Sequence, residues 1–248
     1  MTIIVVGRVD EGIVVAADSA VTHVSASGLT TTYDGEKVFR LTSHAPMVAA
    51  SVGQLNHVLR DIREVALNTI AVSYQDGRWV AGFEDGQLIY RHHSVRNVAE
   101  GLGISLNHGL EVAQEVQALF GVNVVPPQIQ DSGIIVAGYS PSEPEGAVFN
   151  WRIRENDESL FFQTCPDDGA ILVAAGMTDV FSSGGYVDRV SRETSLVDVV
   201  KVAGQAISDT AAHYATADAL NPGVGYPIKI ATITPDGDVH WEALDDQG

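Results

Sequence analysis

Short runs of β-branched and small apolar residues open the chain and predict paired strands. Residues 2–7 (TIIVVG) and 12–17 (GIVVAA) flank an acidic turn that ends in glycine, Asp10-Glu11-Gly12, which is typical of a hairpin. The segment 19–32 is rich in Ser, Thr and Gly and predicts a loop. Apolar runs at 38–41 and 47–52 predict two further strands, the second of which ends at Gly53.

From Gln54 onward the apolar residues change period. They recur at steps of three and four over 54–70, which predicts an amphipathic helix carrying Leu55, Val58, Leu59, Ile62, Val65, Ala66 and Ile70. The pattern predicts further helices at about 95–120 and 196–217. Between the first two helices, Gly and Asp punctuate short aromatic-bearing runs, so we expect an inserted hairpin near 76–94.

Strands return after Pro126-Pro127, which interrupts the chain. The apolar runs predict strands at 133–138, 147–153, 159–164, 170–175, 227–233 and 239–243. Strands, two helices, strands, a helix and strands follow one another, and this order favours layered α+β packing over alternating βαβ units. We therefore expect two sheets face to face with helices outside both. The sequence shows no repeat or linker, which predicts a single domain over 1–248.

The composition excludes some partners. The chain has 32 acidic and 14 basic residues, and its formal charge of -18 repels phosphates and anionic lipids, so we expect neither nucleic acid nor membrane as a partner. No apolar run approaches the roughly 20 residues that span a bilayer, and the first residues lack a signal peptide's basic region. The single cysteine, Cys165, allows no internal disulfide and favours the reducing cytoplasm.

The most informative residue for chemistry is Thr2. Initiator Met is normally removed when the second residue is small, and Thr2 would then carry both a hydroxyl and a free α-amine. An α-amine has a reference pKa of about 8, so it can take the hydroxyl proton directly or through one water. Alternatively, Thr2 merely starts an edge strand.

Two charged residues strengthen the catalytic interpretation. Asp18 ends the second predicted strand, and a hairpin returns that strand beside the first, so its carboxylate can lie near Thr2. Lys37, one of three lysines, begins a later strand; its ammonium would lower the pKa of the amine and hydroxyl, with Asp18 orienting it. The same pair could instead be a structural ion pair or two unrelated surface charges.

The sequence resembles proteasome β-subunits and their bacterial ring-protease relatives, which are N-terminal-nucleophile hydrolases. The resemblance rests on Thr2, the AADS tetrad at 16–19 and the KVF stretch at 37–39, which occur in this order. The segments 47–53, 134–138 and 227–237 are also similar to that family. The resemblance implies a four-layer αββα sandwich, threonine-peptidase activity on peptides or unfolded proteins, and homo-oligomeric rings. It further implies that Thr2 is nucleophile and base and that Asp18 and Lys37 tune it. A backbone N–H near Val52 or Gly53 would bind the oxyanion, because a Gly-bearing turn that opens a helix offers unpaired N–H groups.

Two departures from the family pattern keep alternatives open. Met177, in Gly176-Met177-Thr178, stands where the family has a serine, unless Thr178 substitutes for it. The late segment 221–225 lacks the family's Asp and Ser, with Asp218 the nearest replacement. A small-amide hydrolase and a non-catalytic ring subunit are therefore the alternatives.

The remaining sequence predicts no cofactor. The histidines, including His92-His93, show no metal-ligand spacing. The segment 182–185 lacks the Lys-Ser/Thr of a phosphate loop and predicts a turn. Without a nucleotide-binding motif, ATP-driven unfolding of substrates would require a separate unfoldase.

Overall fold

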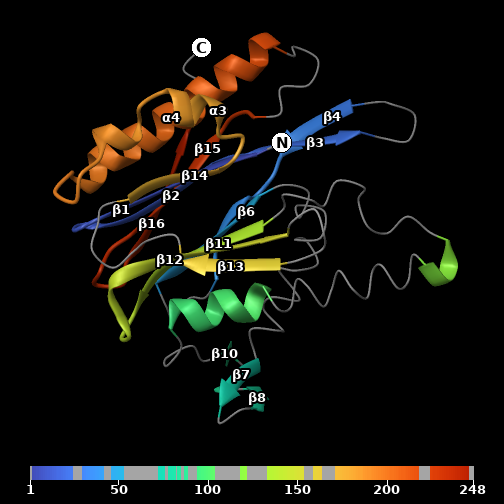
Figure 1. The fold of residues 1–248 in the computed structure, drawn as a ribbon, viewed down its shortest axis with the longest axis vertical. Coiled ribbons are helices and arrows are strands. Elements are labelled where there is room, and N and C mark those ends of the chain that lie inside the picture. Colours follow the sequence, from blue (N-terminus) through green and yellow to red (C-terminus); the bar gives the residue numbers. More distant parts are fainter. Residues whose placement is uncertain are drawn as a thin grey trace.

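The computed structural model describes residues 2–24, 30–41, 46–52, 72–75, 78–81, 83–84, 87–88, 94–103, 118–121, 133–153, 159–163, 171–217 and 224–245. Two five-stranded antiparallel sheets dominate it (Figure 1). The first has the order β14-β1-β2-β15-β16, made of Ile171–Gly176, Ile3–Val9, Gly12–Asp18, Ile228–Ile233 and Val239–Leu244. The second has the order β13-β12-β11-β6-β5, made of Ser159–Gln163, Glu143–Ile153, Gly133–Ser140, Met47–Val52 and Val38–Arg40.

The first hairpin is the one that the sequence predicts. Val9 pairs with Gly12 across a turn at Asp10 and Glu11, and the register runs back to Ile4 opposite Ala17. Every residue of β1 and β2 is buried, because both faces of these strands are covered. This explains why their sequence is continuously apolar rather than alternating.

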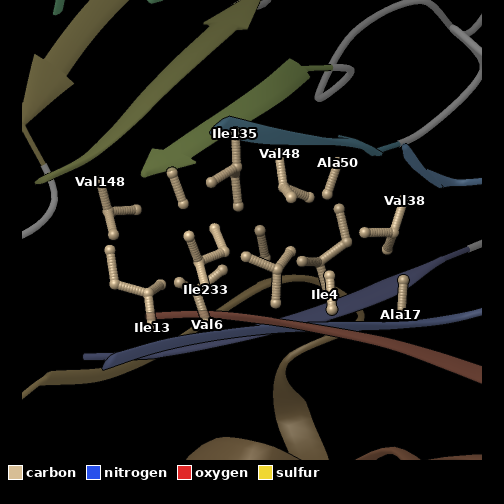
Figure 2. Close-up of a cluster of buried hydrophobic side chains, with 14 of the residues drawn as sticks. Ile4, Val6, Ile13, Ala17, Val38, Val48, Ala50, Ile135, Val148 and Ile233 are labelled. Atoms are coloured by element: carbon tan, nitrogen blue, oxygen red, sulfur yellow. The ribbon is translucent and has the colours of Figure 1, made fainter. Parts of the chain in front are cut away.

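The main core lies between the two sheets. Alternate residues of each inner strand meet there, including Ile4 and Val6 of β1, Val48 of β6 and Ile135 of β11 (Figure 2). Side chains in a strand alternate between the two faces, so the intervening residues Ile3 and Val5 enter a second cluster on the other side of the first sheet.

The second cluster is covered by α4 (Leu196–Ala217), which confirms the predicted helix at 196–217. Val199, Ala203, Ala206 and Ile207 of α4 are buried against the sheet. Gly7 allows the close approach, because a Cβ there would lie 2.4 Å from Val199 Cγ1. The short helices α3 (Asp179–Ser183) and η2 (Val187–Arg189) precede α4, and the predicted turn at 182–185 coincides with the end of α3.

Within the helix predicted at 95–120, residues 95–103 and 118–120 are helical, and the segment 95–103 lies beside the second sheet (Figure 1, green). Ser94 caps it, because Ser94 Oγ accepts a hydrogen bond from Asn97 N at 3.0 Å. Glu143 of β12 accepts from Val95 N at 2.7 Å, which places a carboxylate at the helix N-terminus. A Cβ at Gly103 would lie 2.4 Å from the Trp151 indole, so helix and sheet are in contact. The helix predicted at 54–70 lies outside the described residues, and the four-layer arrangement as a whole stays a prediction.

Two predictions about the early chain need correction. The segment 19–32 is not all loop, since β3 (Ala20–Val24) pairs with β4 (Thr30–Asp34). Its Val and Thr residues favour extended backbone, and the Ser and Gly that suggested a loop are concentrated at 25–28, between the strands. Paired strands also begin at Val72, ahead of the hairpin predicted near 76–94: β7 (Val72–Gln75) pairs with β8 (Arg78–Ala81), and β9 (Phe83–Glu84) with β10 (Gln87–Leu88).

The predicted strand at 147–153 starts earlier, at Glu143, because it pairs with β11 up to the turn at 141–142. In the part of the chain that the structure describes, no helix is long and apolar enough to cross a membrane.

Candidate active site

The carboxylate of Asp18 lies at the start of β1. The antiparallel register brings the end of β2 beside the beginning of β1, and Ile3 N donates to Asp18 Oδ1 at 3.0 Å. Ile3 directly follows Thr2, which is itself buried. The hairpin therefore places Asp18 against the backbone of the residue after the predicted nucleophile.

Lys37 completes a buried ion pair with Asp18. Lys37 Nζ lies 2.7 Å from Asp18 Oδ2, and the two side chains are 1% and 0% exposed. Lys37 immediately precedes β5 of the second sheet, and its carbonyl accepts from Ser51 N of β6 at 2.9 Å. The ion pair thus joins the two sheets at the end of the sandwich where Thr2 lies. This excludes the alternative of two unrelated surface charges.

Burial and pairing act against each other at both charges. Burial lowers the pKa of the Lys37 ammonium, and the adjacent Asp18 carboxylate opposes that shift. Burial likewise raises the pKa of Asp18, while the charge of Lys37 and hydrogen bonds from Lys37, Ile3 and Gly225 oppose it. Each group therefore depends on the other to stay ionised.

Gly225 and Ser19 form a third side of the site. Gly225 N donates to Asp18 Oδ2 at 3.4 Å, and Ser19 N donates to Gly225 O at 3.4 Å. Ser19 O accepts from Gly35 N at 2.8 Å, which fixes the segment that leads to Lys37. The buried Ser19 Oγ has no hydrogen-bond partner among the described residues. Ser19 belongs to the AADS tetrad and Gly225 to the late segment 221–225 that departs from the family pattern, and the sequence predicted no role for either residue.

The segment 176–178, in which Met177 stands where the family has a serine, lies beside Thr2. Met177 N donates to Thr2 O at 2.9 Å. Gly176 has a φ of +89°, and a Cβ there would lie 2.0 Å from Thr2 O, so only glycine fits. The Met177 side chain packs against the cluster under α4, and Thr178 precedes α3 without making a side-chain cap.

Several predicted residues lie outside the part of the chain that the structure describes. They are Gly53, the expected oxyanion-binding residue, together with Asp218, Asn221, Cys165, His92 and His93. Val52, the residue before Gly53, is buried, and its Cγ1 would lie 3.5 Å from a Cβ at Gly176. The end of β6 therefore reaches the same end of the sandwich as Thr2.

The fold and this site define a class of protein, an α+β sandwich of two antiparallel sheets with α4 over the first sheet. A buried Lys–Asp pair lies at the end of the sandwich where the chain begins. Solved structures of Anbu, described as an ancestral β-subunit, have this fold. The protein from Yersinia bercovieri superposes with a TM-score of 0.65 at 13% identity, over 100% of this chain and 88% of that one. A Gly-1 mutant of Anbu from Hyphomicrobium sp. strain MC1 gives a TM-score of 0.63 at 14% identity, with the same coverage.

Anbu from Pseudomonas aeruginosa, solved as a helical assembly, gives a TM-score of 0.61 at 17% identity over 99% of this chain and 88% of that chain. These identities establish a shared fold alone. No family model matches the sequence, and no curated protein matches it.

Proposed function

We propose that this chain is a threonine-type peptidase of the proteasome β-subunit kind, with Thr2 as nucleophile. One observation carries the proposal: the buried Lys37–Asp18 pair is hydrogen-bonded to the amide of the residue that follows Thr2. A buried ion pair contributes little to stability compared with apolar residues of similar volume. Its position beside the start of β1 is therefore better explained by chemistry at Thr2 than by folding.

In the proposed reaction Thr2 is the first residue of the mature chain, so everything that precedes it must be removed. Its α-amine accepts the hydroxyl proton, directly or through one water, while Oγ1 bonds to the substrate's carbonyl carbon. The α-ammonium then protonates the leaving amine as the C–N bond breaks, which leaves an ester on Thr2. Water, deprotonated by the same amine, hydrolyses the ester.

Lys37 and Asp18 would prepare Thr2 for this reaction. A positive charge near Thr2 stabilises the deprotonated hydroxyl and the neutral amine, so it lowers the pKa of both groups. Asp18 keeps that charge in place at 2.7 Å and fixes the backbone of Ile3 with its other oxygen. A backbone N–H near Val52 or Gly53 would bind the oxyanion.

Copies of this chain would assemble, enclosing the sites away from other proteins, and an ATP-driven unfoldase would be a separate protein. We infer a homo-oligomer from the resemblance to ring proteases and from the shared fold with Anbu, one example of which forms a helical assembly. Unfolded protein is then the substrate class, and a small amide is the alternative.

A non-catalytic subunit is the second candidate, and Met177 is the observation that favours it. The amide of Met177 contacts Thr2 O, but its side chain offers no hydroxyl where the family has a serine. If the serine's part in proton transfer is indispensable, the site keeps its geometry and loses its activity.

Mass spectrometry of the purified N-terminus, combined with hydrolysis of fluorogenic peptides and small amides, tests the proposal. We expect a chain that begins at Thr2, a loss of at least a hundredfold in kcat/KM for Thr2→Ala, and partial activity for Thr2→Ser, which keeps a hydroxyl and an amine. Lys37→Arg should also be poor, because the wider guanidinium delivers its charge in a different geometry. Full activity in Thr2→Ala would refute the peptidase proposal. A correctly processed wild type that cleaves nothing would favour the non-catalytic subunit, and cleavage of small amides alone would favour the amidohydrolase.

A further inference from the structure

In the part of the chain that the structure describes, the strand β16 is an edge of the first sheet. Among the described strands it pairs with β15 alone, and every residue from His240 to Leu244 is exposed. Trp241 keeps 45% of its surface exposed. Natural edge strands are protected by charged side chains, lysine above all, and by proline, bulges or extreme shortness, since an open row of backbone groups pairs with other strands. The sequence VHWEAL of β16 contains neither lysine nor proline, and Glu242 is its one acidic residue.

The backbone direction of β16 follows from its turn. Thr234 N donates to Asp238 O at 3.0 Å, so these two residues form a hydrogen-bonded pair of the ladder. Hydrogen-bonded pairs recur at every second residue of an antiparallel ladder. His240, Glu242 and Leu244 therefore bond to β15, and the N–H and C=O groups of Val239, Trp241 and Ala243 point away from the sheet.

We propose that two copies of this chain pair antiparallel through β16, with Trp241 on the two-fold axis. A two-fold contact uses the same surface of both copies, so β16 must be complementary to itself. Outward-pointing residues must face each other for their backbones to bond. Two registers satisfy this over most of the strand. In one, residues 239–243 pair with residues 243–239 of the second copy, and in the other, residues 240–244 pair with residues 244–240 of the second copy.

Charge selects between these registers. The register centred on Trp241 places His240 opposite the second copy's Glu242, and does so twice by symmetry. The imidazole can donate a hydrogen bond to the carboxylate. The register centred on Glu242 places this carboxylate opposite itself, and like charges directly opposite each other are destabilising. The self-complementary register is therefore the one centred on Trp241.

The side chains fit that register on both faces. Val239 packs against the core between the sheets, so Trp241 lies on the same face two residues later. The two Trp241 rings would meet there as a directly opposed aromatic pair, a favourable cross-strand combination. His240 and Glu242 lie on the opposite face, in a non-hydrogen-bonded pair where side chains approach most closely. The contact would join the first sheets of two copies into one continuous sheet.

The proposal is tested by sedimentation of the full chain over a range of concentrations, with circular dichroism to verify folding. Ala243→Pro removes an outward N–H but no bond to β15, and proline is tolerated on edge strands. Ala243→Pro and Trp241→Glu should each weaken the two-fold contact at least tenfold. Val197→Glu is the matched control, because Val197 is 64% exposed on α4, and it should change nothing.

A charge exchange distinguishes the proposed register from non-specific association through exposed apolar residues. Glu242→Lys should weaken association at least tenfold, and combining it with His240→Glu should restore the wild-type dissociation constant to within about threefold, because the opposite charges again face each other. If other surfaces build a larger assembly, Ala243→Pro should halve its subunit number. A wild type that stays monomeric at every concentration, or an Ala243→Pro variant with unchanged assembly, would overturn the proposal.

Discussion

Replacing Asp18 by asparagine removes one charge from the buried pair and keeps the shape of the side chain. The substitution leaves the Lys37 ammonium, 1% exposed, without the carboxylate that lies 2.7 Å away in the wild type. Breaking a buried ion pair from one side costs about 3–5 kcal/mol of folding free energy, because the remaining charge stays desolvated. We therefore expect Asp18→Asn to lower the melting temperature at pH 7 by about 6–20 °C.

Proton loss from Lys37 sets the upper limit of this penalty and gives it a pH dependence. Folding with a neutral lysine at pH 7, against an ordinary pKa of 10.5, costs about 4.8 kcal/mol at 1.36 kcal/mol per unit. At pH 10 the same step costs about 0.7 kcal/mol. The folded pKa of Lys37 is lowered, so the unfolded chain binds more protons and stability rises with pH. The penalty of Asp18→Asn should therefore shrink between pH 7 and pH 10, by at most about 4 kcal/mol.

The converse substitution, Lys37→Met, should show the opposite pH dependence. It leaves the Asp18 carboxylate buried, and protonating a carboxyl with an ordinary pKa of 3.8 costs about 4.4 kcal/mol at pH 7 but about 1.6 kcal/mol at pH 5. The folded pKa is raised, so stability is lost as pH rises. The double variant removes both charges and should recover to within about 2 kcal/mol of the wild type.

Urea unfolding at a fixed protein concentration measures these differences, because association adds its own free energy to the apparent stability. Each variant's free energy of unfolding is compared with that of the wild type at the same pH, so the contributions of all other titrating groups cancel. Two results would refute the reasoning: a cost below about 1 kcal/mol for Asp18→Asn at pH 7, or a penalty that stays the same at pH 10. Either would mean that water or another group compensates Lys37.

Two further substitutions test the packing around the site and at the far end of the sandwich. Gly176→Ala should cost about 2–4 kcal/mol in thermal unfolding, since its φ is +89° and its Cβ would overlap Thr2 O. The control Gly185→Ala, with a φ of +63° and nothing within 4 Å, should cost about 1 kcal/mol; equal costs would contradict the close approach. Burial raises the pKa of Tyr139 from 10.0 to about 12, so the folded state holds a proton that the unfolded state loses, and stability should fall above pH 10. Tyr139→Phe should remove about 1 kcal/mol of the stability lost between pH 10 and pH 11, and identical pH profiles in urea would contradict the shift.

The sequence by itself determined the strands of the two sheets and the long helix. Their signals are local: β-branched runs on either side of an acidic turn that ends in glycine predict β1 and β2, apolar runs predict β15 and β16, and a three-to-four-residue period predicts α4. It failed where composition and pairing disagree, at β3 and β4, because a hairpin ladder orders residues that in isolation favour a loop. The position of Asp18 near Thr2 also came from sequence, because a hairpin fixes which strand ends meet. Lys37 was predicted as its partner, with two unrelated surface charges as an alternative.

Only the tertiary structure decided that these two charges are fully buried and joined, since the sequence left two unrelated surface charges open as an alternative. Asp18 belongs to the first sheet and Lys37 leads into the second, so their distance depends on how the sheets stack. The roles of Gly225 and Ser19 have the same origin: their contacts with the site are backbone hydrogen bonds between segments far apart in the sequence. A backbone amide is common to nearly every residue, so side-chain identity carries no signal for such contacts, and packing alone determines them.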